Sequence, residues 1–111
     1  MERCKTVKSD SLMLDTVVER LKQDQPEKII LFGSYATGQA DEYSDLDFVV
    51  IKKTDKRFIE RLVETSRIIG FDLGKIDVFV YSPEEWQRMI EWENPFAEQV
   101  LKKGKVVYEK E

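Results

Sequence analysis

Three aspartates are the residues of this chain that are best placed to do chemistry. Asp45 and Asp47 stand two positions apart at the start of an apolar run, and Asp77 stands between Ile76 and Val78 in another such run. Side chains two positions apart on a strand point to the same face of a sheet, so the first two carboxylates project together. Two carboxylates on one face repel each other unless a cation lies between them. If the two strands are neighbours, all three carboxylates converge.

The residue types that the chain lacks narrow this chemistry further. The sequence has no histidine and one cysteine, Cys4. Ser-His-Asp and Cys-His catalysis, His-ligated zinc and Cys-cluster metal sites are therefore excluded within this chain. Carboxylate oxygens remain for acid-base work and metal binding, and they suit a hard cation such as Mg²⁺. The alternative is that Asp45 and Asp47 are solvated residues where a strand begins, and that Asp77 faces water.

A glycine and a serine follow the first apolar run. Gly33 and Ser34 allow a sharp turn there, with backbone N–H groups and a hydroxyl that could hold a phosphate. The turn is neither a Walker loop nor a dinucleotide fingerprint, because the further Gly and Lys positions of those motifs are missing. Taken alone, a Gly-Ser pair is more often a plain turn. Here ten residues separate it from Asp45-x-Asp47, and Ser44 directly precedes the first aspartate.

Apolar periodicity, turn residues and cap residues predict the elements that must position these side chains. Strands are expected over 28–32, 46–51 and 75–81, with an edge strand over 106–108. Residues 35–44 are expected to form a loop, or a loop with one helical turn. Helices are expected over 9–23 with a cap at Ser9 or Ser11, from a cap at Thr54 or Asp55 to Gly70, from Ser82-Pro83 through Ile90, and from Asn94-Pro95 to near Gly104. The order α-β-β-α-β-α-α-β predicts an α/β (α+β) fold, in which helices back a small mixed β-sheet.

Composition predicts one small domain that does not bind nucleic acid stably. The 111 residues fit a single domain over 1–111, and 41% hydrophobic residues provide enough material for a core. The net charge of −4 gives no basic footprint for nucleic acid. The sequence shows no signal-peptide core and no apolar run near the roughly 18 residues that span a bilayer. We therefore expect a cytoplasmic protein without a membrane partner.

The segment Ile29 to Val80 resembles the minimal nucleotidyltransferases of the DNA polymerase beta superfamily, whose defining motif is Gly-Ser, a ten-residue spacer and Asp-x-Asp. The resemblance implies the nucleotidyltransferase fold and a site with two Mg²⁺ ions. It implies that the ions are bound by Asp45, Asp47 and Asp77, and that Gly33, Ser34 and Ser44 bind the nucleoside triphosphate. It further implies transfer of a nucleoside monophosphate, AMP from ATP, to a hydroxyl, with Asp77 as the candidate that takes the proton.

Many members of this superfamily carry arginine at the position of Tyr35 or Thr37, and both residues are uncharged here. That difference leaves the charge of the transition state to the metals and puts the rate of catalysis in question.

Catalytic domains of this size are similar to the antitoxins that are paired with HEPN-domain ribonuclease toxins. The resemblance implies AMPylation of a tyrosine of such a toxin. The chain would form a hetero-oligomer with the toxin or a homodimer. Trp86, Trp92 and Phe96 lie close together in the sequence and would suit a partner surface, although all three could instead pack in the core. The alternative function is a binding module that neutralises its partner by complex formation without catalysis.

Overall fold

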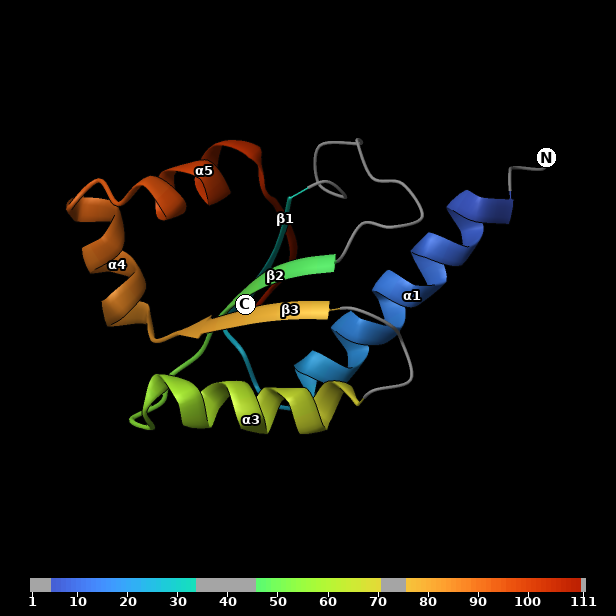
Figure 1. Ribbon diagram of the computed structural model, residues 1–111, viewed down its shortest axis with the longest axis horizontal. Coiled ribbons are helices and arrows are strands. Elements are labelled where there is room, and N and C mark those ends of the chain that lie inside the picture. Colours follow the sequence, from blue (N-terminus) through green and yellow to red (C-terminus); the bar gives the residue numbers. More distant parts are fainter. Residues whose placement is uncertain (1–4, 34–45, 71–75, 111) are drawn as a thin grey trace.

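The structure, a computed structural model, describes residues 5–33, 46–70 and 76–110. In these ranges the elements follow the predicted order, which is confirmed (Figure 1). They are α1 (Lys5–Lys22), β1 (Lys28–Phe32), β2 (Leu46–Ile51), α3 (Phe58–Ile69), β3 (Ile76–Tyr81), α4 (Pro83–Glu91), α5 (Pro95–Lys103) and β4 (Lys105–Glu109). The predicted loop 35–44 lies outside the described residues. No helix in the described part combines the length and the apolar character that crossing a membrane requires.

The four strands form one mixed sheet in the order β3-β2-β1-β4. β1 pairs antiparallel with β2 and with β4, whereas β2 pairs parallel with β3. The parallel pair is possible because α3 carries the chain from the end of β2 back to the start of β3. The small mixed sheet and the edge position of β4 are therefore as predicted.

Helices cover both faces of this sheet, and the alternation of side chains along each strand sorts the core into two clusters. α1 and α3 pack on one face, and α4 and α5 pack on the other (Figure 1). The first cluster includes Val17, Leu21, Ile29, Leu31, Phe48, Val50, Ile69 and Val80. The second includes Ile30, Val49, Ile51, Trp86, Ala97 and Val100. Burial on both faces explains why the strands appear as nearly continuous apolar runs.

Cap residues set several helix boundaries, and the predicted cap of α3 is wrong. The Ser82 hydroxyl accepts a hydrogen bond from the Glu85 N–H (3.2 Å), and the Glu85 carboxylate accepts one from the Ser82 N–H (2.9 Å), as a capping box requires. α3, however, is capped by Arg57 and not by Thr54 or Asp55. The Thr54 hydroxyl instead accepts a hydrogen bond from the Lys56 N–H, which forms a turn before the helix.

The N-terminal helix is longer than predicted. α1 begins at Lys5, although a cap was expected at Ser9 or Ser11. The residues before those serines include neither proline nor glycine, so nothing in the local sequence stops the helix from extending toward the N-terminus.

A buried arginine joins α3, the edge strand β3 and α4. Arg61 is 6% exposed, and its side chain donates to the Val80 carbonyl oxygen (3.1 Å) and to both carboxylate oxygens of Glu85 (2.6 and 3.1 Å). This hydrogen bonding lowers the pKa of Glu85. The ion pair therefore holds the start of α4 against the end of the sheet, and its buried member depends on Glu85 for charge compensation.

Glu85→Gln is expected to lower the free energy of unfolding by about 2 kcal/mol at neutral pH, because it leaves the Arg61 charge buried without a counter-charge. The pKa of Glu85 is lower in the folded protein than in the unfolded chain. Its contribution to stability is therefore complete above the unfolded pKa of about 4.3 and is lost as the pH falls through the folded pKa. Urea unfolding at about pH 7 and about pH 3 should show a difference between the two proteins that shrinks on acidification.

Glu84→Gln is the matched control, because Glu84 is exposed and makes no ion pair within the described residues. It should change the free energy of unfolding by no more than about 0.5 kcal/mol. Equal effects of the two variants, or a difference independent of pH, would show that the Arg61–Glu85 pair does not carry this stability.

Candidate active site

Asp47 and Asp77 lie side by side at one end of the sheet. β2 and β3 are parallel, and their register places Asp47 directly opposite Asp77. Residues paired in this way point to the same face, here the face covered by α4 and α5. Asp47 is half-buried and Asp77 is exposed. The structure thus brings together two of the three aspartates that the sequence singled out.

The backbone of Gly33 passes very close to the Asp47 carboxylate. Phe32, the last residue of β1, pairs with Asp47, so the turn that follows β1 lies over the Asp47 side chain. Gly33 has a positive φ of 81°, and a Cβ at this position would lie 2.5 Å from Asp47 Oδ2. Glycine is therefore required for two reasons, the backbone conformation and the space beside the carboxylate. The sequence predicts a sharp turn here but not this contact.

The other predicted site residues, Ser34, Ser44 and Asp45, lie outside the described residues, and their places in the site stay predictions. Within the described ranges, no group of three or more histidine, cysteine, aspartate or glutamate residues is arranged to hold a metal ion. The described part of the site therefore consists of Gly33, Asp47 and Asp77.

An aromatic cluster borders the two carboxylates, and the sequence analysis missed it. Phe32, Phe79 and Phe96 pack on the same face of the sheet, with ring centroids 5.3 Å apart for Phe32 and Phe96 and 5.5 Å apart for Phe79 and Phe96. Phe79 follows Asp77 by two positions on β3, which is the signal that could have revealed it. The rings provide an apolar wall beside the carboxylates, and such a wall strengthens electrostatic interactions in a site.

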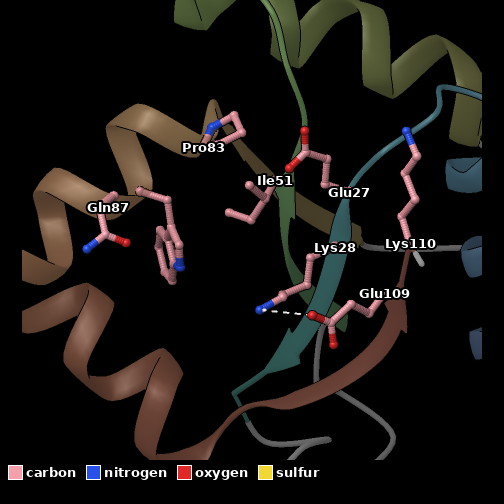
Figure 2. A pocket seen from close by; sticks show the side chains of 8 residues that line it. Glu27, Lys28, Ile51, Pro83, Gln87, Glu109 and Lys110 are labelled. Carbon is pink, nitrogen blue, oxygen red and sulfur yellow. Dashed lines mark ion pairs between the residues drawn. The ribbon is translucent and has the colours of Figure 1, made fainter.

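A cavity of about 500 Å³ lies away from the two aspartates. Figure 2 shows residues that line it: Glu27, Lys28, Ile51, Pro83, Gln87, Glu109 and Lys110. Lys28 begins β1 and Ile51 ends β2, so the cavity is at the opposite end of the sheet from Asp47. Lys28 Nζ and a Glu109 carboxylate oxygen form an ion pair there at 3.7 Å. None of the residues that line the cavity belongs to the predicted site. We therefore identify the candidate site from the paired carboxylates and not from this cavity.

Sequence comparisons identify the family of the chain. A family model for polymerase beta nucleotidyltransferases matches residues 15–111. A candidate protein adenylyltransferase of Methanocaldococcus jannaschii is 35% identical over 82 residues, which are 74% of this chain and 78% of that protein. A second candidate protein adenylyltransferase of the same organism is 51% identical over 53 residues, which are 44% of this chain and 36% of that protein.

Solved structures share the fold. The crystal structure of a candidate nucleotidyltransferase from Sulfolobus solfataricus aligns with a TM-score of 0.68 and 22% identity, over 98% of this chain and 91% of that chain. A toxin–antitoxin structure with AMP-PNP aligns with a TM-score of 0.62 and 22% identity, over 87% of this chain and 73% of that chain. These comparisons confirm the resemblance and the fold class that the motif predicted. The chain belongs to the polymerase beta nucleotidyltransferase family.

Proposed function

We propose that this chain uses ATP and Mg²⁺ to transfer AMP to a hydroxyl group of a partner protein. The observation that carries the proposal is the in-register pairing of Asp47 with Asp77, with the backbone of Gly33 against the Asp47 carboxylate. Two adjacent carboxylates on one face attract a cation. The absence of a side chain at Gly33 gives the Asp47 carboxylate the room that a Cβ would otherwise take. We further propose that the partner is a HEPN-family ribonuclease toxin, modified on a tyrosine.

The donor set fits magnesium, because Mg²⁺ prefers carboxylate and phosphate oxygens as ligands. Asp47 and Asp77 would hold the ions together with Asp45. When bound, two Mg²⁺ ions neutralise charge on the triphosphate and on the attacking and leaving oxygens. We place Gly33, Ser34 and Ser44 at the triphosphate.

Asp77 is the proposed acceptor of the proton. Its side chain is exposed on the edge strand β3, where a group from another protein can reach it. The acceptor oxygen attacks the α-phosphorus of ATP and forms a new P–O bond, while the bond between the α-phosphorus and the bridging oxygen breaks. Pyrophosphate leaves, and the proton of the attacking hydroxyl passes to the Asp77 carboxylate. Alignment of hydroxyl and phosphorus by the bound partner would supply much of the rate acceleration.

Two findings support a protein as the acceptor. The relatives in Methanocaldococcus jannaschii are named as candidate protein adenylyltransferases, and two of the structures with the same fold are toxin–antitoxin structures, one of them of MntA–HpeT. The net charge of −4 makes a polynucleotide a poor acceptor, because a bound phosphate backbone needs positive charge around it.

Mass spectrometry of the partner tests the proposal. The chain is co-expressed with a HEPN-family ribonuclease, and the mass of the intact ribonuclease is measured. Each transferred AMP should add about 329 Da, and Asp47→Ala should abolish the addition. Peptide mapping would show whether the modified residue is a tyrosine. If the wild-type chain and its Asp47→Ala variant neutralise the ribonuclease equally, and the mass of the ribonuclease does not change, the chain is a binding module without catalysis.

A further inference from the structure

The aromatic residues of the two C-terminal helices have different environments. Trp86 is 7% exposed and Phe96 is partly buried, but Trp92 is 75% exposed. The alternative that all three pack in the core is therefore wrong for Trp92. Trp92 follows the last residue of α4, where the chain turns toward α5 through Glu93 with a positive φ of 54°. The indole consequently leaves the buried side of the helix.

Trp92 is the end of an apolar strip on the surface of α4. Its first part consists of Arg88 and Met89 on α4 and of Trp92 directly after the helix. Trp92 follows the other two by four and three positions, about one helical turn, so the three lie on one side. Phe58 from the start of α3, 39% exposed, and Tyr81 from the end of β3 continue it, with ring centroids 5.7 Å apart. These five residues, here named the α4 strip, line a groove of about 280 Å³ together with Glu85.

Backbone hydrogen bonds hold the main chain at Trp92 before any partner binds. The Trp92 N–H donates to the Arg88 carbonyl oxygen (2.9 Å), and the Asn94 N–H donates to the Met89 carbonyl oxygen (2.9 Å). The Asn94 side chain then caps α5. A tryptophan side chain has only two rotatable bonds, so it loses little conformational entropy when it is covered. Such residues are typical anchors of protein interfaces.

The charge of the groove indicates what kind of surface fits it. Glu85 lines the groove, but its charge is compensated by Arg61. Arg88 has no ion-pair partner among the described residues, so the groove keeps one positive charge on a chain whose net charge is −4. An apolar side chain next to a carboxylate therefore complements the α4 strip in both shape and charge.

The α4 strip is continuous with the candidate active site. Tyr81 and Asp77 are on β3 and point to the same face, and Tyr81 is four positions after Asp77, which corresponds to about 13 Å along the strand. A protein interface of ordinary size buries about 800 Å² on each partner and extends well beyond that distance. A protein seated on the strip can therefore present a hydroxyl at Asp77.

We infer that the α4 strip is the docking surface for the protein that accepts AMP, through an apolar side chain flanked by an acidic residue. This inference rests on the proposed function, since it takes the acceptor to be a protein. It assigns binding of that protein to residues that do not take part in the chemistry.

Binding and transfer are measured separately with the HEPN-family ribonuclease named above. Affinity is measured by calorimetry for the wild-type chain and for Trp92→Ala, Arg88→Glu and Leu101→Ala. Leu101 is the matched control, because it is also a large apolar residue that is 52% exposed, but it lies on α5 outside the strip. Trp92→Ala and Arg88→Glu should each weaken binding by about tenfold or more, and Leu101→Ala by less than about twofold.

The thermal midpoint of Trp92→Ala should match that of the wild type, because an exposed side chain contributes little to folding. Hydrolysis of ATP without the ribonuclease should also be unchanged. Wild-type affinity in Trp92→Ala and Arg88→Glu, no binding by the wild-type chain, or a dimer of this chain that Trp92→Ala dissociates would overturn the docking surface. Strip-dependent binding without any transfer of AMP would instead keep the docking surface and refute the proposed function.

Discussion

Asp77→Asn is expected to lower the rate of AMP transfer by about a thousandfold or more. The amide can neither accept the proton of the attacking hydroxyl nor contribute negative charge to a metal site, and loss of a general base alone costs about 10²- to 10⁴-fold. Asp47→Asn should be comparably inactive, because it removes the half-buried carboxylate that pairs with Asp77 across β2 and β3. Single-turnover transfer from labelled ATP measures both effects.

The same substitutions are expected to leave the metal-free protein folded. Two carboxylates in register on neighbouring parallel strands repel each other, so removing one charge relieves this repulsion and creates no cavity. The thermal midpoint without Mg²⁺ should be equal to that of the wild type or slightly higher. With Mg²⁺ and a non-hydrolysable ATP analogue, the wild-type midpoint should rise and the variants should respond less, since ligands that bind the folded state stabilise it.

Asp55→Asn is the matched control, because Asp55 is exposed in the connection between β2 and α3. It should transfer AMP at the wild-type rate. If Asp47→Asn and Asp77→Asn unfold at clearly lower temperature, the aspartates serve the fold. If both transfer AMP normally, the chemistry takes place elsewhere in the chain.

The sequence contains most of the information for the sheet. Unbroken apolar runs, separated by glycine and proline, mark strands that are buried on both faces, and this is why β1 and β2 match their predicted bounds. The side-chain alternation of strands places Asp47 on one definite face relative to its neighbours. The convergence of the aspartates was predicted only on the condition that β2 and β3 are neighbours, because no local signal in the sequence indicates which strands pair. The structure shows that they do pair.

Contacts between residues that are distant in sequence could not be predicted in the same way. Arg61 belongs to a helix with an apolar stripe, and its partner Glu85 is in another helix, so neither position signals a buried ion pair. The exposure of Trp92 depends on the turn after α4, which periodicity does not describe. The cap of α3 was misplaced because Thr54 and Asp55 have good capping side chains, yet the Thr54 hydroxyl is used in a turn.

Gly33→Ala is expected to reduce AMP transfer by about a hundredfold and to lower the free energy of unfolding by about 1–3 kcal/mol. The added Cβ would lie 2.5 Å from Asp47 Oδ2, so the carboxylate must move away from its place opposite Asp77. The positive φ of 81° adds a backbone penalty that an L-residue cannot avoid. Transfer from labelled ATP and urea unfolding measure the two effects.

Gly70→Ala separates the loss of the site from the loss of stability. Gly70 has nearly the same backbone angle, a φ of 84°, but it ends α3 on the opposite face of the sheet from the Asp47 side chain. Its substitution should cost a similar backbone penalty and leave transfer nearly intact at temperatures where the protein is folded. A Gly33→Ala protein that is as active as Gly70→Ala would mean that this glycine serves the turn after β1 and not the space beside Asp47. Selective loss of transfer in Gly33→Ala would instead tie the first glycine of the Gly-Ser motif to the position of a carboxylate in the site.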